Sequence, residues 1–245
     1  MEVNKIYQGD CLEVMSDIAD KSIDMILCDL PYGTTACKWD TIIPFEPLWE
    51  QYKRIIKDNG AILLTASQPF TSALVMSNIK NYKHSWIWNK KFAGNFVTAK
   101  YAPMKIHEDI IVFNFGNIRY FPQMTKRDKP IKSGANKCNS DSAKFSKNSI
   151  NKGFRKIYYE KFPESLLLYP RERGLHPTQK PVALFEYLIK TYTNEGDLVL
   201  DNCAGSGTTA VACINTKRNY ILIEKEKEYC DIIKKRIKEL PTKLF

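Results

Sequence analysis

The segment "DLPY", Asp29 to Tyr32, brings residue types that can do chemistry together at one position. It directly follows the apolar run "SIDMILC", so Asp29 is expected at the carboxyl end of a strand, the edge at which open α/β sheets bind their ligands. A carboxylate, a rigid proline and an aromatic ring at such an edge form either an ordinary strand-to-turn exit or the working part of an active site. The segment alone does not decide between these two interpretations.

A second segment, "LVLDNCAGSGTTAVACI" (residues 198–214), has the pattern of a strand, a glycine loop and a helix. The strand would end at Asp201, and Gly205 and Gly207 would let the backbone approach a ligand closely. This pattern is typical of a nucleotide site. Its G-x-G-x-x-A spacing also fits the dinucleotide fingerprint, with Glu224 after the next strand placed to hold ribose hydroxyls. Two strand ends with polar residues would then meet at one crevice.

Short β-branched and aliphatic runs alternate with helical periodicities along the chain. This alternation predicts an α/β fold with a mostly parallel sheet and helices on both faces. The last helix is expected around Tyr229 to Ile237, and another should begin near Pro181 with Thr178 as a cap. The strand candidates are Lys5 to Gln8, Ile23 to Cys28, Ala61 to Thr65, His84 to Trp88, Ile110 to Phe115, Leu198 to Asp201 and Tyr220 to Ile223.

Positive charge is concentrated in one part of the chain. The formal net charge is +10, and residues 117–161 contain 12 Lys or Arg against three acidic residues, a local balance of +9. Within this part, Ser133 to Gly153 is rich in Ser, Asn, Lys and Gly and can contribute little to a core. Because strand-forming segments resume on both sides, we interpret it as a flexible part of a basic insertion. A basic insertion suits binding to nucleic acid.

Several classes of protein are disfavoured by composition. The seven cysteines are never spaced as C-x-x-C, and the three histidines lie far apart, so neither a disulfide framework nor a metal site is predicted. No apolar run approaches the roughly 20 residues of a membrane-spanning helix, and the start of the chain does not look like a secretory signal. With 44% hydrophobic residues, the sequence predicts a globular, cytoplasmic protein.

The motifs together resemble those of a known family. "DLPY" resembles the Asp-Pro-Pro-Tyr catalytic motif of the amino-group DNA methyltransferases, and "DNCAGSGTT" resembles their S-adenosylmethionine loop. "HPTQKP", residues 176–181, and "QGDCLEVM", residues 8–15, are similar to two further segments of the family. The catalytic motif precedes the cofactor loop, which is the order of the β class, a circular permutation of the others. The resemblance implies a Rossmann-like, circularly permuted methyltransferase sheet.

The resemblance also implies roles for the catalytic motif. Asp29 would accept one hydrogen of the target amino group and the main-chain carbonyl of Leu30 the other, so that the nitrogen lone pair points at the methyl group. Pro31 would fix the turn, and Tyr32 would stack on a base flipped out of the duplex. Leu30 departs from the commoner Pro, and Cys203 departs from the Phe often found in the cofactor loop.

For the cofactor, S-adenosylmethionine, the family pattern implies contacts along several segments. Glu224 would bind the ribose hydroxyls, Asp10 with Cys11 would lie near the adenine, and Lys180 with the following helix start would receive the carboxylate. The loop residues expected in contact are Gly205, Ser206 and Gly207 against the methionine part, with Asp201, Cys203, Ala204, Thr208 and Thr209 beside them and Thr178 upstream.

The chain is expected to divide into two regions. Residues 1–116 and 171–245 would form the catalytic and cofactor-binding domain, and residues 117–170 an inserted basic target-recognition region. The expected partner is duplex DNA, and a second copy of the chain and a cognate restriction endonuclease are further candidates. The expected DNA contacts are Lys126, Arg127, Lys129, Lys132, Arg155 and Lys156.

Methylation of N6 of adenine is favoured, because an initial Asp in the tetrapeptide is commoner among the adenine enzymes of the family. N4 methylation of cytosine is the alternative within the family. A nicotinamide-dependent oxidoreductase and a non-catalytic DNA-binding protein are more distant alternatives. The first leaves "DLPY" and the basic insertion unexplained, and the second has no use for two chemical motifs at one sheet edge.

Overall fold

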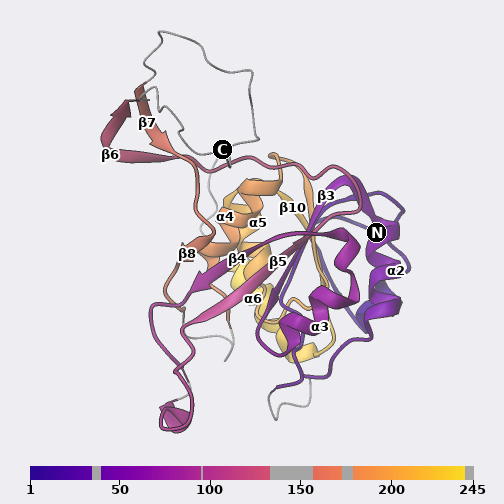
Figure 1. Ribbon diagram of the computed structural model, residues 1–245. Helices are drawn as coiled ribbons and strands as arrows, with labels where there is room; N and C mark the ends of the chain where they lie inside the picture. The colour runs from indigo at the N-terminus through magenta and orange to yellow at the C-terminus, as the bar shows by residue number, and fades with distance from the viewer. Residues whose placement is uncertain (35–39, 95, 133–156, 173–178, 241–245) are drawn as a thin grey trace. The chain divides into compact units, whose positions relative to one another are not determined.

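The computed structural model describes residues 1–34, 40–94, 96–132, 157–172 and 179–240 (Figure 1). Two compact units are present. The larger consists of Met1–Phe121 with Ser165–Phe245, and the smaller of Pro122–Glu164. The smaller unit falls inside the insertion expected at residues 117–170.

An eight-stranded sheet forms the centre of the larger unit, in the order β1-β10-β9-β2-β3-β5-β4-β8. All of its described strand pairs are parallel except those made by β5, which runs antiparallel to β3 and to β4. This confirms the predicted mostly parallel α/β sheet. The strands are β1 Lys5–Gln8, β2 Ile23–Cys28, β3 Ile56–Ala66, β4 Tyr82–Asn89, β5 His107–Phe113, β8 Leu166–Leu168, β9 Leu198–Asp201 and β10 Asn219–Glu224.

Helices cover both faces of this sheet, and side chains of β2 alternate between the two cores. Ile26 and Cys28 pack in one core with residues of the early helices, while Met25 and Leu27 pack in the other with residues of the late helices. No helix among the described residues is long and apolar enough to cross a membrane. The helices are α1 Cys11–Met15, α2 Phe45–Ile55, α3 Phe70–Ser77, α4 Val182–Tyr192, α5 Thr208–Asn215 and α6 Lys227–Lys238, with short 3₁₀ turns η1 Ile79–Asn81 and η2 Phe96–Thr98.

The start of α4 differs in detail from the sequence-based expectation. Pro181 precedes the helix with an extended backbone instead of lying in its first turn. The Glu172 carboxylate accepts a hydrogen bond from the Val182 backbone N–H at 3.0 Å, so a side chain ten positions upstream satisfies this free amide. Thr178, the expected cap, lies outside the described residues.

Strand ends at one edge of the sheet carry the candidate chemistry. β2 pairs in parallel with β9 through Met25 with Val199 and Ile26 with Leu200, so the chain leaves both strands at the same edge. Asp29 follows β2 and Asp201 ends β9. β10, which ends at Glu224, pairs in parallel with β9 on its other side. The predicted convergence of two motifs at one edge is therefore present.

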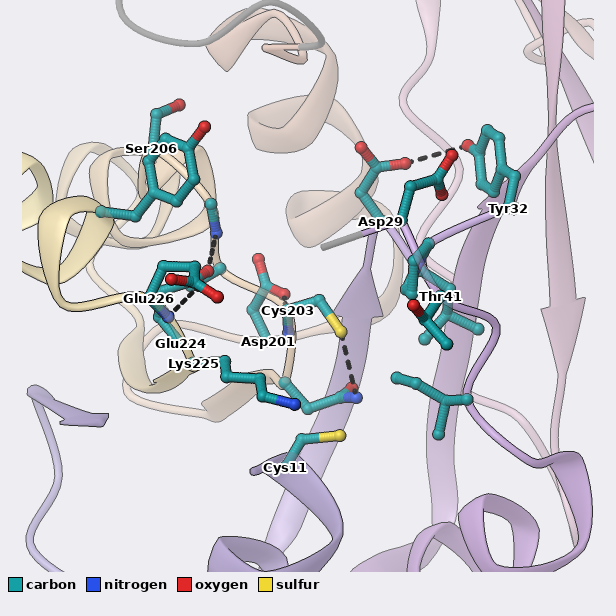
Figure 2. A pocket seen from close by; sticks show the side chains of 18 of the residues that line it. Cys11, Asp29, Tyr32, Thr41, Asp201, Cys203, Ser206, Glu224, Lys225 and Glu226 are labelled. Atoms are coloured by element: carbon teal, nitrogen blue, oxygen red, sulfur yellow. Dashed lines mark hydrogen bonds between the residues drawn. The ribbon is translucent and has the colours of Figure 1, made fainter. Parts of the chain in front are cut away.

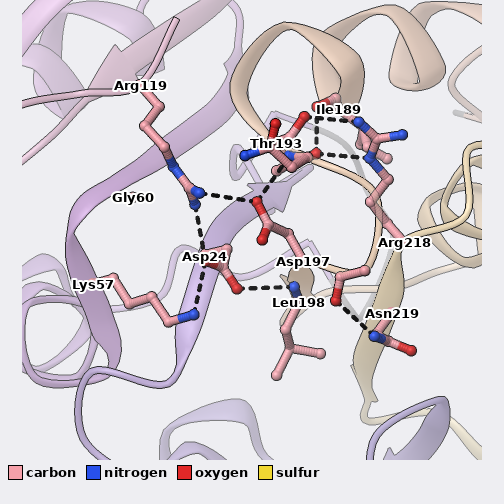
Figure 3. A network of polar contacts seen from close by, with 12 residues as sticks. Asp24, Lys57, Gly60, Arg119, Ile189, Thr193, Asp197, Leu198, Arg218 and Asn219 are labelled. Atoms are coloured by element: carbon pink, nitrogen blue, oxygen red, sulfur yellow. Dashed lines mark hydrogen bonds and ion pairs between the residues drawn. The ribbon is translucent and has the colours of Figure 1, made fainter.

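The opposite edge is held by a buried carboxylate, Asp24 of β2 (Figure 3). One oxygen accepts bonds from Lys57 and Arg119, each at 2.8 Å, and the other from the Leu198 backbone N–H at 3.0 Å. Burial alone would raise the pKa of the Asp24 carboxyl, but these three donors more than offset burial and hold the pKa below its usual value. Asp24 thereby ties the start of β2 to the start of β9.

The smaller unit is built on a two-stranded antiparallel sheet, β6 Thr125–Lys132 with β7 Ile157–Lys161. The Arg127 Nε donates to the Glu160 backbone carbonyl at 3.0 Å across these strands. The segment Ser133 to Gly153, predicted to be a flexible part of the insertion, lies outside the described residues.

We expect Asp24→Asn to lower the free energy of unfolding by about 2 kcal/mol, because it leaves buried donors without a carboxylate. The folded-state pKa of Asp24 lies below 3.8, so its stabilisation is present above that pH and lost as the pH falls through the folded pKa. Urea unfolding of both proteins should give a constant difference near neutral pH and a shrinking one below about pH 4.

The matched control is Asp58→Asn. The Asp58 side chain is 87% exposed, and the substitution removes its ion pair with Lys21. It should change stability by less than about 0.5 kcal/mol. Equal effects of the two substitutions would contradict the structural role of Asp24.

Candidate active site

A cavity of about 370 Å³ lies at the carboxyl edge of the large sheet (Figure 2). Figure 2 shows Asp29 and Tyr32 on one side of it and Asp201, Cys203 and Glu224 on the other. Most of the residues predicted for the catalytic motif and the cofactor line it together. They are Asp10, Cys11, Asp29, Leu30, Pro31, Tyr32, Lys180, Asp201, Cys203, Ala204, Gly205, Ser206, Thr208 and Glu224.

The Asp29 carboxylate is held through both of its oxygens. On Oδ1, the Tyr32 hydroxyl approaches to 2.9 Å and the Thr65 hydroxyl donates a hydrogen bond. On Oδ2, the Lys180 ammonium donates at 2.5 Å. Because Thr65 lies on β3 and Lys180 lies just before α4, three separate segments fix the orientation of this carboxylate. Its remaining lone pairs make it an acceptor of defined direction.

Lys180 belongs to a buried chain of alternating charges. Its ammonium lies 3.4 Å from Glu108 as well as 2.5 Å from Asp29, and Glu108 in turn pairs with Lys90 at 2.9 Å. Burial alone would lower the pKa of Lys180, but Asp29 and Glu108 raise it above its usual value. Burial likewise opposes ionisation of Glu108, yet Lys180 and Lys90 lower the Glu108 pKa. The shifts of Lys180 and Glu108 favour their charged forms, and each of these two groups lies between two partners of opposite charge.

The Tyr32 ring has a defined environment on two sides. It stacks on Phe70 with ring centroids 5.2 Å apart and planes inclined by 26°. The Lys180 ammonium lies 5.9 Å from its centroid. Burial, together with the nearby charges of Asp29 and Glu108, raises the pKa of Tyr32 well above its usual value. The phenol therefore keeps its proton and serves as a hydrogen-bond donor.

The glycine loop is tied to Glu224 at the end of β10. One Glu224 oxygen accepts from the Gly205 backbone N–H at 2.7 Å and the other from the Glu226 N–H at 2.9 Å. Gly205 and Gly207 both have positive φ, which favours glycine, but their surroundings differ. A Cβ at Gly207 would lie 2.8 Å from Ile233, whereas one at Gly205 would meet nothing within 4 Å. Helix packing requires the glycine at 207, and open space faces Gly205.

Asp201, at the end of β9, forms hydrogen bonds with residues at both ends of the glycine loop. Its oxygens accept bonds from the Thr209 hydroxyl and, at 3.1 Å, from the Cys203 N–H. Burial raises the pKa of Asp201 to about 7. Thr209 and Gly207 do not line the cavity and act behind it, while Thr178 lies outside the described residues.

The environment of the thiols beside the cavity favours their protonated form. Burial raises the pKa of Cys28 to about 12, and a hydrogen bond with Cys203, followed by burial, raises the pKa of Cys11. Protonated thiols are poor nucleophiles and poor metal ligands. Within the described ranges, no three His, Cys, Asp or Glu side chains are placed to hold a metal ion.

Asp10 lies at the cavity wall and caps α1. Its Oδ1 accepts a hydrogen bond from the Leu12 N–H at 3.0 Å, and its Oδ2 lies 3.8 Å from the Lys225 ammonium. The ion pair is solvent-exposed, with the Lys225 side chain 71% and the Asp10 side chain 44% accessible. A contact of this kind is weak, so the second oxygen can exchange it for a ligand.

Sequence reasoning missed Glu108, Thr65 and Phe70. Glu108 reaches the cavity because β5 runs antiparallel, which places the beginning of this strand at the edge where the parallel strands end. Thr65 lies inside an apolar run, and Phe70 begins α3. No local motif marks any of the three residues. Only knowledge that β5 pairs antiparallel with β3 would have indicated Glu108.

The predicted DNA contacts belong to the smaller unit. Lys126 and Lys129 are exposed on β6, Arg127 is half-buried, and Lys132 ends the strand. Arg155 and Lys156 lie outside the described residues.

Comparison with known families agrees with the motifs. A model of the DNA methylase family, which covers N6 and N4 enzymes, matches residues 23–235. The chain belongs to this family. It is an amino-group DNA methyltransferase of the β class, as the motif order predicted. YhdJ of Escherichia coli (strain K12), named a DNA adenine methyltransferase, is 30% identical over 93% of this chain and 80% of its own. The Type II methyltransferase M.HpaI of Haemophilus parainfluenzae is 29% identical over 95% of this chain and 74% of its own.

Solved structures confirm the methyltransferase fold. The M1.HpyAVI–SAM complex superposes on this DNA methylase with a TM-score of 0.64 and 25% identity, covering 95% of this chain and 98% of the other. PvuII DNA methyltransferase, described as cytosine-N4-specific, has a TM-score of 0.67 at 14% identity, over 100% of this chain and 89% of its own. At that identity the second likeness concerns the fold alone.

Proposed function

We propose that this DNA methyltransferase transfers a methyl group from S-adenosylmethionine to N6 of adenine in DNA. The observation that carries the proposal is the fixed Asp29 carboxylate facing the cavity that the glycine loop and Glu224 also line. The adenine assignment is supported by the initial Asp of "DLPY" and by the name of YhdJ. The cofactor is supported by the likeness to M1.HpyAVI, which was crystallised as a complex with SAM.

The catalytic motif would act by positioning the target amino group. This nitrogen is a poor nucleophile because its lone pair is delocalised into the ring, and the base must first leave the stack. Asp29 would accept one amino hydrogen and the Leu30 carbonyl the other, which favours a tetrahedral nitrogen, and Asp29 would then take the proton released. Tyr32 would stack on the base with the face opposite Phe70. Most of the rate enhancement would come from this alignment.

The cavity residues fit the cofactor, which supplies an activated methyl group. Each Glu224 oxygen accepts one backbone bond, so lone pairs remain for the two ribose hydroxyls. The open space at Gly205 suits close approach of a ligand to the backbone. Asp10 and Cys11 would lie near the adenine, and Ser206 would face the methionine part.

Lys180 has two proposed roles. The helix start that follows it remains the proposed site for the cofactor carboxylate. Its contacts with Asp29 and Glu108 support a further role, in which it orients the Asp29 carboxylate. Glu108 would in turn limit how strongly Lys180 holds Asp29.

The insertion is the proposed target-recognition region, residues 117–170, with Lys126, Arg127, Lys129, Lys132, Arg155 and Lys156 as phosphate contacts. The local balance of +9 supports this role. The Type II names of the relatives support a cognate restriction endonuclease as a partner, and a cellular DNA substrate supports a cytoplasmic location. A second copy of the chain stays a candidate partner.

DNA from cells that express the protein should contain N6-methyladenine at a defined sequence, as measured by mass spectrometry of digested DNA and by modification-sensitive sequencing. Asp29→Asn, which keeps the shape of the side chain, should lower the rate of methyl transfer by at least about 100-fold. Its affinity for S-adenosylmethionine, measured by calorimetry, should stay within about threefold of the parent, because Asp29 would contact the base. N4-methylcytosine as the sole product would overturn the adenine assignment.

Glu108→Gln should lower kcat by about tenfold or more, because Lys180 and Lys90 lose the carboxylate they share and the buried cluster keeps one positive charge without a partner. The double variant Glu108→Gln/Lys90→Gln restores the charge balance and should recover part of the rate. A coupling energy of about 1 kcal/mol or more in this cycle is expected. Strictly additive effects would mean that Glu108 acts through packing alone.

Neutralising Lys126, Arg127, Lys129 and Lys132 together should flatten the slope of log affinity against log salt. Each residue that meets a phosphate contributes about 0.9 to this slope, so four contribute up to about 3.6. The matched control neutralises Lys227, Lys234, Lys235 and Lys238, which are exposed on α6 and change the net charge equally. An equal change in both variants would show that net charge, and not contact, is responsible.

A further inference from the structure

The connection between β4 and β5 carries an exposed group of apolar side chains. We define the arm as residues 90–94 and 96–106, since Asn95 lies outside the described residues, and Figure 1 shows this magenta segment extending away from the sheet. Phe92, Phe96, Val97 and Tyr101 are 69%, 84%, 90% and 89% exposed. Apolar side chains scattered singly on a surface are ordinary, but four strongly exposed ones within ten positions of one connection indicate an interaction site.

The base of the arm is anchored beside the active site. The Lys90 N–H donates to the Ile106 carbonyl at 2.9 Å, and the Gly94 N–H donates to the Lys105 carbonyl at 2.8 Å. The Lys105 ammonium donates to the Ser67 hydroxyl, and Lys90 pairs with Glu108, which lines the cavity. The arm therefore leaves the sheet at the edge where Asp29 lies.

Charge selects the partner that fits this surface. The arm contains four lysines and no acidic residue, and Lys91 and Lys100, which adjoin Phe92 and Tyr101 in the sequence, are exposed. A second copy of the chain would bring a formal charge of +10 against them, which opposes self-association. A polyanion with exposed aromatic surfaces, namely DNA with unstacked bases, complements both the charge and the rings.

We propose that the arm is a second DNA-contacting element, separate from the basic insertion, whose aromatic side chains stack on the bases left unpaired when the target nucleotide turns out of the duplex. The inference rests on the proposed function. Extruding a base costs unstacking and unpairing energy, and aromatic side chains that stack on the exposed bases offset part of that cost. Lys91 and Lys100 would contact the adjacent phosphates.

The test uses the double variant Phe96→Ala/Tyr101→Ala. Its control is Met76→Ala/Ile79→Ala, which removes two apolar side chains that are 69% and 51% exposed outside the arm. The substrates are two synthetic duplexes carrying the site found by sequencing, one with the target adenine paired to thymine and one with it facing an abasic residue. The arm variant should lose about tenfold or more in kcat/KM on the paired duplex and recover most of it on the other. The control should behave as the parent on both.

Three outcomes would overturn the inference. In the first, the arm variant has the same kcat/KM as the parent on the paired duplex. In the second, its kcat/KM falls equally on both duplexes. In the third, sedimentation shows a dimeric parent and a monomeric arm variant, which would assign the arm to contact with a second copy. Thermal unfolding and calorimetric binding of S-adenosylmethionine, expected unchanged, separate these outcomes from misfolding. Failure of the parent itself to methylate either duplex would instead contradict the proposed function.

Discussion

The parallel pairing of β2 with β9 is the constraint on which the active site depends. It joins strands from opposite ends of the sequence and makes Asp29 and Asp201 leave the sheet at one edge. Asp24 reinforces the pairing at the other edge by bonding to the Leu198 N–H. Because this contact is non-local, its loop-closure entropy must be offset by burial of both faces of the strands. β2, which is buried along its whole length, supplies much of that burial.

Lys180 connects three of the segments that this pairing brings together. Its ammonium contacts Asp29 and Glu108, and its carbonyl accepts a bond from the Thr208 hydroxyl at the start of α5, at 3.3 Å. Taking four charges out of water is costly, so the cluster around Lys180 is weak evidence for stability. Its stronger consequence is specificity, since each charge has a partner in only one arrangement. In its proposed role, an Asp29 carboxylate oriented in this way would need little reorganisation when a base arrives.

Most of the positive charge and the two most exposed aromatic side chains among the described residues lie in different parts of the chain. The insertion holds nearly the whole positive excess, which suits long-range attraction to a duplex but carries no information on base pairing. The arm has fewer charges, and its Phe96 and Tyr101 rings are 84% and 89% exposed, which suits short-range contact at a distorted step. Its first residue, Lys90, also begins the buried chain of alternating charges that runs through Glu108 and Lys180 to Asp29. The surface that would meet the duplex and the group that would meet the base are thus physically continuous.

The sequence by itself determined the strands whose apolar runs end in polar residues, because that pattern is local. β1, β2 and β9 have the predicted bounds, and the motifs that follow β2 and β9 line one cavity. Only the tertiary structure decided the rest. Glu108 enters the site because β5 is antiparallel, and Lys180 pairs with Asp29 because the segment before α4 packs against the end of β2. Such contacts depend on the order and direction of the strands. The local pattern of apolar residues does not determine either of them.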